Sequence, residues 1–256
     1  MTAGLLEVRG LCKRFGGLTA VAGLDFTVRM GQIKALIGPN GAGKTTIFNM
    51  ISGVLAPTAG QVLFEGAPLP VARPHAVAAR GIARTFQLVR LFGEMTVLEN
   101  VLVGCHRRGR AGWVSCALRS APMREEERGL HRVAWDALSQ VGLAERAHMA
   151  AAALPYGAQR LVEVARALAT GPRLLLLDEP GAGLNAKEHE RLAALIERIR
   201  DAGTTVLLVD HHMDFVMDLS DEVLVLSYGQ KLAEGPPAAV RRNAEVIAAY
   251  LGEEAA

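Results

Sequence analysis

The sequence predicts an α/β fold: a mostly parallel sheet covered by helices on both faces, with an antiparallel β edge and an inserted α-helical subdomain. Three observations predict it. Short apolar strands alternate with helical segments at both ends of the chain, residues 97–169 have mostly helical spacing, and half of the 256 residues are apolar. A chain of this length and composition can bury the core of one large domain that carries a subdomain.

The first elements are mainly strands. Apolar and polar residues alternate at 6–11 and 24–28, which predicts two strands paired at the edge of a sheet. The run at 32–37 is mostly apolar and ends in a Gly/Pro/Asn cluster, as a buried strand does. The next elements expected are a helix at 44–52 and short strands at 61–64 and 82–86.

Helical spacing dominates the middle of the chain, and strands return after it. An Arg- and Gly-rich loop at 107–119 interrupts the helical block. Further strands are expected at 173–177, 204–209 and 222–226, with helices at 186–201 and from near His211. We therefore expect one domain over 1–256, with a helical subdomain at about 88–168 inserted in its core and a short helical tail at about 236–256.

Composition excludes several classes of protein. The formal net charge of +2 is too small for electrostatic capture of nucleic acid. The first residues carry no basic segment followed by an apolar one, and no apolar run approaches the roughly 20 residues of a membrane span. Cys12, Cys105 and Cys116 lie outside any CxxC pattern, which indicates free thiols rather than a disulfide framework or a zinc site. These features predict a cytosolic globular protein.

A phosphate-binding loop follows the buried strand. Residues 38–45, Gly-Pro-Asn-Gly-Ala-Gly-Lys-Thr, match G-x-x-x-x-G-K-[ST] between a strand and a helix. Glycines let successive N–H groups point at phosphate oxygens, and the helix start adds its positive dipole end. Lys44 is expected at the β- and γ-phosphates, Thr45 on Mg²⁺ and Thr46 at the α-phosphate. The alternative is a glycine-rich turn that only joins strand to helix. The candidate phosphate-binding residues are Gly38, Pro39, Asn40, Gly41, Ala42, Gly43, Lys44, Thr45 and Thr46.

Two adjacent carboxylates end a later strand. The leucines at 174–177 run into Asp178 and Glu179. A buried strand with this end places Asp178 near Mg²⁺ and Glu179 where it polarises an attacking water. By themselves these residues also fit a strand that ends in a solvated turn, but together with the phosphate loop they indicate nucleotide hydrolysis.

Further segments resemble those of ABC ATPases, over essentially the whole chain. Phe86-Gln87 resembles the glutamine loop, which implies that Gln87 touches Mg²⁺ and the attacking water. Residues 154–160 occupy the place of the Leu-Ser-Gly-Gly-Gln signature, and 162–168 resemble the helix after it. Residues 183–185 resemble the loop that crosses the dimer interface. Asp210-His211-His212-Met213 resembles the switch region, which implies that His211 reaches the γ-phosphate.

The resemblance also implies an adenine site. The segment 13–18 looks like the adenine-stacking loop, in which Phe15 supplies the aromatic face and Val21 packs beside it. The alternative for Phe15 is an ordinary aromatic side chain at the end of a strand. His212 stands where relatives commonly have Asp, and we expect it to be a solvated variation.

Among ABC ATPases the chain is most similar to the ATP-binding subunits of bacterial branched-chain amino acid importers. The segments that carry this similarity are 14–18, 84–87, 89–92, 95–100, 182–185 and the tail 246–252. The resemblance implies ATP and Mg²⁺ as cofactors, and a second ATPase subunit as partner, in a hetero- or homodimer. It also implies two transmembrane permease subunits as partners and, indirectly, a periplasmic substrate-binding protein. The implied location is the cytoplasmic face of the inner membrane. Importers of urea, amides or aromatic acids remain alternatives.

The signature departs from the family pattern. Pro155 takes the serine position, Tyr156 the first glycine and Ala158 the first glutamine, while Gly157 is retained. Proline suits a first helical turn but has neither hydroxyl nor N–H. The resemblance implies that Pro155, Tyr156 and Gly157 cover the nucleotide bound by the partner subunit. We therefore expect that nucleotide to be hydrolysed more slowly.

Two segments are expected to meet other molecules. Residues 88–95 are apolar apart from Arg90 and Glu94, and in relatives this stretch receives the cytoplasmic helix of the membrane subunit. The loop 107–119 holds four arginines, no acid and Trp113. This composition suits contact with anionic headgroups or with a membrane subunit. The alternative is a solvated insertion without a partner.

Other classes fit less of the sequence. A soluble ABC ATPase acting on ribosomes or DNA usually carries two cassettes or long insertions, which this chain lacks. A P-loop kinase leaves Gln87, the signature-like segment and His211 unexplained. An exporter subunit differs only in its partners, and residues 89–100 together with the tail favour import.

Overall fold

The computed structural model describes residues 4–109 and 121–254, which fold as two compact units. One unit combines 1–84 with 173–256, and the other comprises 85–172. The segments before and after the helical block therefore fold together into one unit, which is called the α/β unit from here on.

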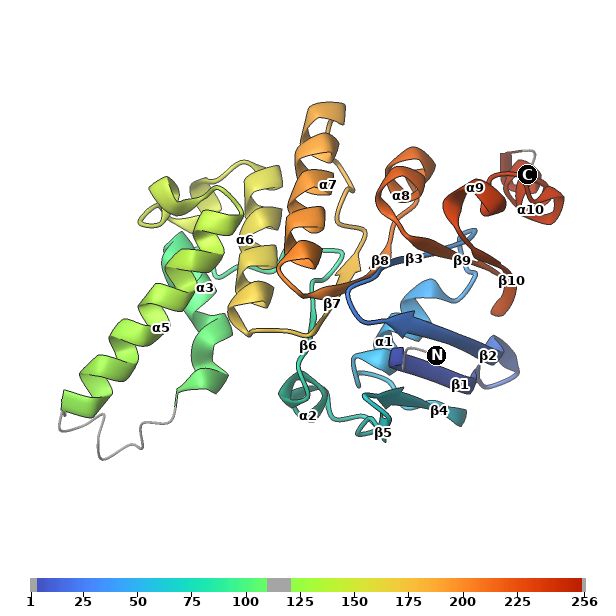
Figure 1. The fold of residues 1–256 in the computed structure, drawn as a ribbon, viewed down its shortest axis with the longest axis horizontal. Coiled ribbons are helices and arrows are strands. Elements are labelled where there is room, and N and C mark those ends of the chain that lie inside the picture. Colours follow the sequence, from blue (N-terminus) through green and yellow to red (C-terminus); the bar gives the residue numbers. More distant parts are fainter. Residues whose placement is uncertain (1–3, 110–120, 255–256) are drawn as a thin grey trace. The chain divides into compact units, whose positions relative to one another are not determined.

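The α/β unit holds two sheets (Figure 1). The six-stranded sheet has the order β10-β9-β3-β8-β7-β6, and all its neighbours are parallel except β9 and β10. The four-stranded sheet is antiparallel, in the order β2-β1-β4-β5. The strands are β1 Gly4–Phe15, β2 Leu18–Arg29, β3 Ile33–Ile37, β4 Ala59–Phe64, β5 Ala67–Pro68, β6 Ile82–Arg84, β7 Leu174–Asp178, β8 Thr205–Val209, β9 Glu222–Ser227 and β10 Gln230–Gly235.

Helices cover both faces of the parallel sheet. Helices α7 and α8 lie on one face, and α1 with the four-stranded sheet lies on the other (Figure 1). Every residue of β3, β7 and β8 is buried, as expected for parallel strands covered on both sides. The helices of this unit are α1 Lys44–Ile51, α2 Pro74–Ala79, α7 Ala186–Asp201, α8 Met213–Leu219, α9 Pro237–Val240 and α10 Ala244–Glu254.

The helical unit consists of packed helices joined by short 3₁₀ turns. Its helices α3, α5 and α6 contact one another pairwise. Helix α3 begins with a capping box, in which Thr96 and Glu99 bond each other's backbone N–H groups. The elements are α3 Val97–Cys105, α5 Ala121–Gln140, α6 Tyr156–Ala169 and the 3₁₀ turns His106–Arg108, Ala144–Arg146 and Ala151–Ala153.

The predicted fold class is confirmed, with one change of detail. The strands expected at 6–11 and 24–28 do pair, with Glu7 opposite Thr27 and Val8 opposite Phe26. They form a separate sheet instead of the edge of the parallel one, because β1 uses its other side to pair with β4. The elements α2, β5 and β10 were not predicted, since two are short and β10 has few apolar residues.

Candidate functional site

The predicted phosphate loop lies between β3 and α1, and close contacts require glycine at two of its positions. Gly43 has φ +98, and a Cβ there would lie 2.6 Å from the carbonyl oxygen of Ala20. A Cβ on Gly38 would collide with the carbonyl oxygen of Leu226. The loop is therefore pressed onto the ends of two strands, where only glycine allows the backbone to approach so closely.

The Lys44 side chain folds over this loop. Its ammonium donates hydrogen bonds to the carbonyl oxygens of Gly38 and Pro39, the latter at 2.8 Å. Asn40 and Thr45 are exposed and Thr46 is half-buried, whereas Ala42 is buried beneath the loop. The ammonium thus lies at the loop that is to receive the phosphates, together with a helix N-terminus.

Asp178 is the last residue of the buried strand β7, and its carboxylate belongs to a network that the sequence did not reveal. Arg84 donates from Nη2 to Asp178 Oδ2 at 2.7 Å. The other terminal nitrogen, Nη1, donates to Asn49 Oδ1 at 2.7 Å and to Ser52 Oγ at 2.9 Å. Because the Arg84 and Asp178 side chains are only 7% and 6% exposed, this is a buried, multiply bonded ion pair. It ties helix α1 to the ends of β6 and β7.

The structure brings together two of the predicted catalytic residues. Glu179 follows Asp178 with φ +47, an uncommon conformation for a residue with a side chain. Its N–H donates to the carbonyl oxygen of Val209 at 2.8 Å, which holds the turn against β8. The nearest carboxylate oxygen lies 4.0 Å from His211 Nδ1.

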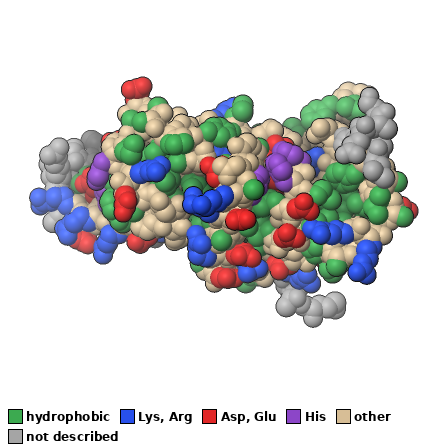
Figure 2. Space-filling view, turned by 90° about the horizontal axis from the view of Figure 1, so that it is seen from above, with side chains coloured by type: hydrophobic (Ala, Val, Ile, Leu, Met, Phe, Trp, Pro, Cys, Tyr) green, Lys and Arg blue, Asp and Glu red, His purple; other side chains and the backbone are tan. Residues whose placement is uncertain are grey.

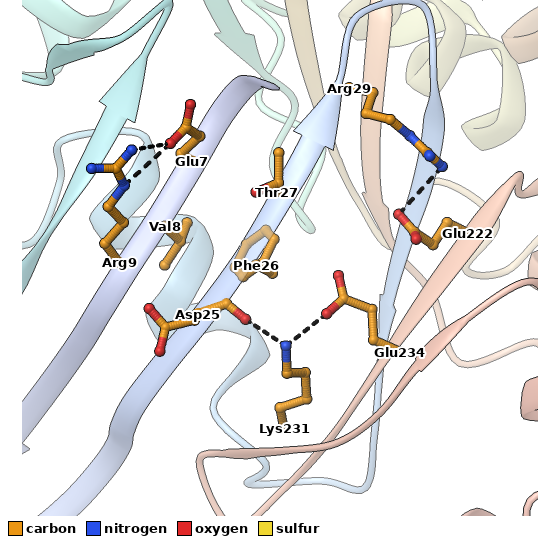
Figure 3. A pocket seen from close by; sticks show the side chains of 10 residues that line it. All are labelled: Glu7, Val8, Arg9, Asp25, Phe26, Thr27, Arg29, Glu222, Lys231 and Glu234. Atoms are coloured by element: carbon orange, nitrogen blue, oxygen red, sulfur yellow. Dashed lines mark hydrogen bonds and ion pairs between the residues drawn. The ribbon is translucent and has the colours of Figure 1, made fainter. Parts of the chain in front are cut away.

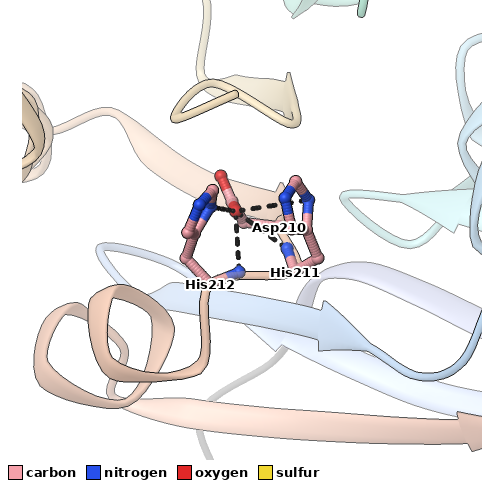
Figure 4. Close-up of side chains that lie close together, drawn as sticks. All are labelled: Asp210, His211 and His212. Atoms are coloured by element: carbon pink, nitrogen blue, oxygen red, sulfur yellow. Dashed lines mark hydrogen bonds and ion pairs between the residues drawn. The ribbon is translucent and has the colours of Figure 1, made fainter. Parts of the chain in front are cut away.

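Asp210 holds the switch region in place. Its buried carboxylate accepts hydrogen bonds from the backbone N–H groups of His211 and His212, at 2.8 and 3.0 Å (Figure 4). It also accepts one from the backbone N–H of Gly181 at 3.1 Å. His212 was expected to be a solvated variation; its side chain is 41% exposed, and its Nδ1 also lies 2.9 Å from Asp210 Oδ1. The His212 ring also packs between the rings of His189 and His211, with centroids 4.7 and 4.2 Å away.

The adenine-site residues differ from each other in exposure. The Phe15 side chain is 48% exposed, and the Lys13 ammonium lies 5.0 Å from its ring centroid. Val21 was expected to pack beside Phe15 in the adenine site, and its side chain is fully buried. The strand β2 turns it inward, where a Cβ on Gly43 would lie 3.4 Å from its methyl group. Val21 therefore supports the phosphate loop from below.

The remaining predicted site residues belong to the helical unit. Gln87 is exposed, and its carbonyl oxygen accepts a hydrogen bond from Arg160 Nη2 at 3.0 Å. Pro155 is the N-cap of α6 and Tyr156 begins that helix, with Gly157 half-buried behind it. Arg160 also packs on the Tyr156 ring, 5.4 Å from its centroid. One arginine thus joins the glutamine loop to the signature-like helix within this unit.

A hollow of about 580 Å³ lies apart from these motif residues in the α/β unit (Figure 3). Its charged side chains pair with one another, as Arg9 does with Glu7 and Lys231 with Glu234. Nearby, the fully buried Lys34 bonds both Glu222, at 3.0 Å, and Glu234. We assign these pairs to the packing of the two sheets.

The loop residues fit a nucleotide and Mg²⁺. A loop in which Gly38 and Gly43 leave no room for a Cβ, the Lys44 ammonium bonded to that loop, and a helix start are the donor set for phosphate oxygens. A hydroxyl on Thr45 and a carboxylate on Asp178 are oxygen ligands of the kind that Mg²⁺ prefers.

Comparison with known proteins agrees with this geometry. A family profile described as "ABC transporter" matches residues 21–182. The chain belongs to the ABC transporter family. This confirms the family expected from the motifs, and makes the chain an ABC transporter ATP-binding subunit, of a kind that acts with permease partners.

Relatives of this ABC subunit match it over their whole length. BraF of Pseudomonas aeruginosa, a high-affinity branched-chain amino acid transport ATP-binding protein, is 45% identical over 254 residues, which are 99% of this chain and 100% of BraF. LivG of Escherichia coli K12, described in the same words, is 45% identical over 256 residues, with the same coverage. A second profile, "Branched-chain amino acid ATP-binding cassette transporter", matches residues 230–256.

The fold of this ABC subunit matches solved cassettes. The ADP form of an ATP-binding cassette of an ABC transporter superposes with a TM-score of 0.86 at 31% identity, covering 98% of this chain and 100% of that one. A nucleotide-free cassette superposes with a TM-score of 0.84 at 31% identity, covering 97% and 99%. Across residues 4–109 and 121–254, no helix combines the length and the apolar character needed to cross a membrane.

Proposed function

We propose that this ABC subunit binds ATP with Mg²⁺ on the loop 38–46 and hydrolyses it to drive uptake of branched-chain amino acids. The observation that carries the proposal is the full-length similarity to BraF and LivG, whose names give that transport activity. The tail supports it, since residues 230–256 match a profile of branched-chain amino acid cassettes.

Each residue has a role in this proposal. Lys44 and the loop N–H groups hold the phosphates, and Phe15 stacks on the adenine. Asp178 and Thr45 would hold Mg²⁺, a role that the family resemblance also implies for Gln87, and the ion would supply positive charge against the phosphate oxygens.

Hydrolysis in this proposal depends on the pair at the ends of β7 and β8. Glu179 accepts a proton from the attacking water, while His211 donates a hydrogen bond to the γ-phosphate. The 4.0 Å between Glu179 Oε2 and His211 Nδ1 supports this pairing, because one water fits within reach of both side chains. Their exposed fractions of 24% and 57% leave both open to a ligand.

The proposed assembly has two ATPase subunits, identical or different, two transmembrane permeases and, indirectly, a periplasmic binding protein, at the cytoplasmic face of the inner membrane. The proposed permease contact is the segment 88–95. Leu88 and Phe92 are 69% and 53% exposed there. The backbone between them is held firmly, because Arg90 N–H donates to Glu163 at 2.9 Å and Asn100 bonds both the N–H and the carbonyl of Phe92. A fixed backbone with exposed apolar side chains suits a protein partner.

The arginine loop is only partly described. Arg107 and Arg108 lie in a 3₁₀ turn, while Arg110, Trp113 and Arg119 lie outside the described residues. We retain the proposal that this loop meets anionic headgroups or a membrane subunit. Changing Arg107, Arg108 and Arg110 to Glu should lower recovery of the complex with membranes, and unchanged recovery would contradict it.

We further propose that the two ATP sites of the assembly turn over unequally. The N-cap of α6 is Pro155, whose side chain makes no capping hydrogen bond, so it offers the partner's nucleotide neither a hydroxyl nor an N–H. Glu179→Gln here should then lower total ATPase activity more than the matching change in the partner subunit. Equal losses would argue against unequal sites.

The proposed transport function is tested by uptake of labelled leucine in cells that lack this subunit. Wild type should restore uptake, and Glu179→Gln should restore about a hundredth of it or less, the loss typical of a missing general base. Glu190→Gln is the matched control, an exposed glutamate of α7. Normal leucine uptake without the subunit would contradict the substrate assignment and direct the same assay to urea, amides and aromatic acids.

A further inference from the structure

Three consecutive residues after β8 place potential metal ligands together. Asp210 Oδ1 lies 2.9 Å from His212 Nδ1 and 3.9 Å from His211 Nδ1 (Figure 4). One ligand atom from each of the three residues lies within 4.8 Å of the others. In a tetrahedral site with metal–ligand bonds of 2.0–2.2 Å the ligand atoms are about 3.3 Å apart. Small side-chain rotations therefore suffice to close the three atoms on one ion.

The surroundings of this cluster favour a cation. Glu179 Oε2 lies 4.0 Å from His211 Nδ1 and adds a second carboxylate. His189 Nδ1 lies 3.1 Å from the carbonyl oxygen of Asn185, and the neutral tautomer that donates to this oxygen has a lone pair on Nε2. That Nε2 atom is buried and has no hydrogen-bond partner within the described part of the chain.

The His189 lone pair faces the same spot as the Asp210 carboxylate. A Cβ on Gly181 would lie 2.6 Å from His189 Nε2 and 3.0 Å from Asp210 Oδ2. The imidazole nitrogen and the carboxylate oxygen thus converge on one glycine. A cation at this cluster relieves their repulsion.

The cluster is also accessible. The His211 and His212 side chains are 57% and 41% exposed, and Figure 2 shows a group of histidine side chains at the surface. Asp210, in contrast, is buried and held by three backbone N–H groups. A fixed carboxylate beside two partly exposed imidazoles is a site that an ion from solution can enter.

We propose that Asp210, His211 and His212 form a binding site for a late first-row divalent ion such as Zn²⁺ or Ni²⁺, whose occupancy stops ATP hydrolysis. Two imidazoles and one carboxylate suit these ions better than Mg²⁺, which prefers oxygen ligands. When the ion binds, the His212 Nδ1 proton leaves and Nε2 takes one from water, so that the imidazole stays neutral. The Nδ1–H···Oδ1 hydrogen bond is replaced by coordination of both atoms.

The inhibitory part rests on the proposed role of His211. An ion bound at Nδ1 holds the His211 ring at Asp210 and removes it from the γ-phosphate. The binding part is independent of that role, because it requires neither nucleotide nor hydrolysis.

Binding is tested with Co²⁺ as a spectroscopic probe, on the nucleotide-free and Mg²⁺-free subunit. Wild type should give visible absorption bands that saturate at one Co²⁺ per chain and disappear when Zn²⁺ is added. His212→Asn should weaken Co²⁺ binding at least tenfold, and the matched control His75→Asn, on the exposed face of α2, should not. Equal Co²⁺ spectra and affinities in wild type and His212→Asn would overturn the site.

Inhibition is tested on the assembled transporter at fixed Mg²⁺, with each variant compared with its own zinc-free rate. The Zn²⁺ concentration that halves hydrolysis should rise at least tenfold in His212→Asn and stay unchanged in His75→Asn. Co²⁺ binding that depends on His212, without any inhibition by Zn²⁺, would support the site and overturn the proposal that its occupancy stops hydrolysis. Inhibition equal in all three proteins would overturn the inhibitory role of the site.

Discussion

Replacing Arg84 by methionine removes a side chain that bonds both Asp178 and helix α1. The guanidinium donates to Asp178, Asn49 and Ser52 over 2.7–2.9 Å. Methionine keeps an unbranched chain of similar length but has no charge and no donor. The Asp178 carboxylate, 6% exposed, then stays buried and loses its ion pair with Arg84.

The expected cost follows from this burial. Removing one partner of a buried ion pair costs about 3–5 kcal/mol, because it leaves an uncompensated charge. In a domain of this size each 1 kcal/mol lowers Tm by about 2–4 °C. We therefore expect Arg84→Met to lower Tm by about 6–20 °C, while the exposed control Arg80→Met changes it by no more than about 2 °C.

The assay is thermal unfolding of four proteins: wild type, Arg84→Met, Asp178→Asn and the double variant. If the pair is the source of the cost, the double variant is less destabilised than the sum of the single ones by at least about 1 kcal/mol. Additive effects, or a loss below about 1 kcal/mol in Arg84→Met, would refute the reasoning.

Three other predictions concern separate parts of the chain. Gly43→Ala should destabilise the protein by about 1–3 kcal/mol and weaken binding of a fluorescent ATP analogue, because the added methyl group meets a carbonyl oxygen of β2. The control is Gly41→Ala, which should destabilise the protein less because a Cβ on Gly41 meets nothing within 4 Å. Burial raises the pKa of the Glu163 carboxyl despite the neighbouring arginines, so the folded state binds this proton more tightly than the unfolded state. Stability should therefore fall as pH rises from the ordinary glutamate pKa to the raised one, and Glu163→Gln should remove that fall in a plot of Tm against pH. Burial also raises the pKa of the Cys105 thiol, so peptide mapping should find maleimide on Cys12 in the native protein and on Cys105 only after denaturation.

Local sequence patterns were enough to predict those parts of the site that are formed by consecutive residues. The loop 38–45 was predicted because its glycines, its lysine and the strand before it are consecutive, and each requirement is met by neighbours in the chain. Asp178 and Glu179 were predicted for the same reason, since a run of leucines marks their strand. The parallel strands were equally visible as short apolar runs.

Long-range pairing decided the rest. Arg84 and Asp178 are 94 residues apart, and only the parallel pairing of β6 with β7 brings them within 2.7 Å. His189 meets His212 because α7 and α8 lie on the same face of one sheet. The sequence by itself showed that these side chains are polar and near chemistry-bearing motifs. It left their partners open, because an ion pair or ring contact between distant segments depends on strand order and register, which no local pattern specifies.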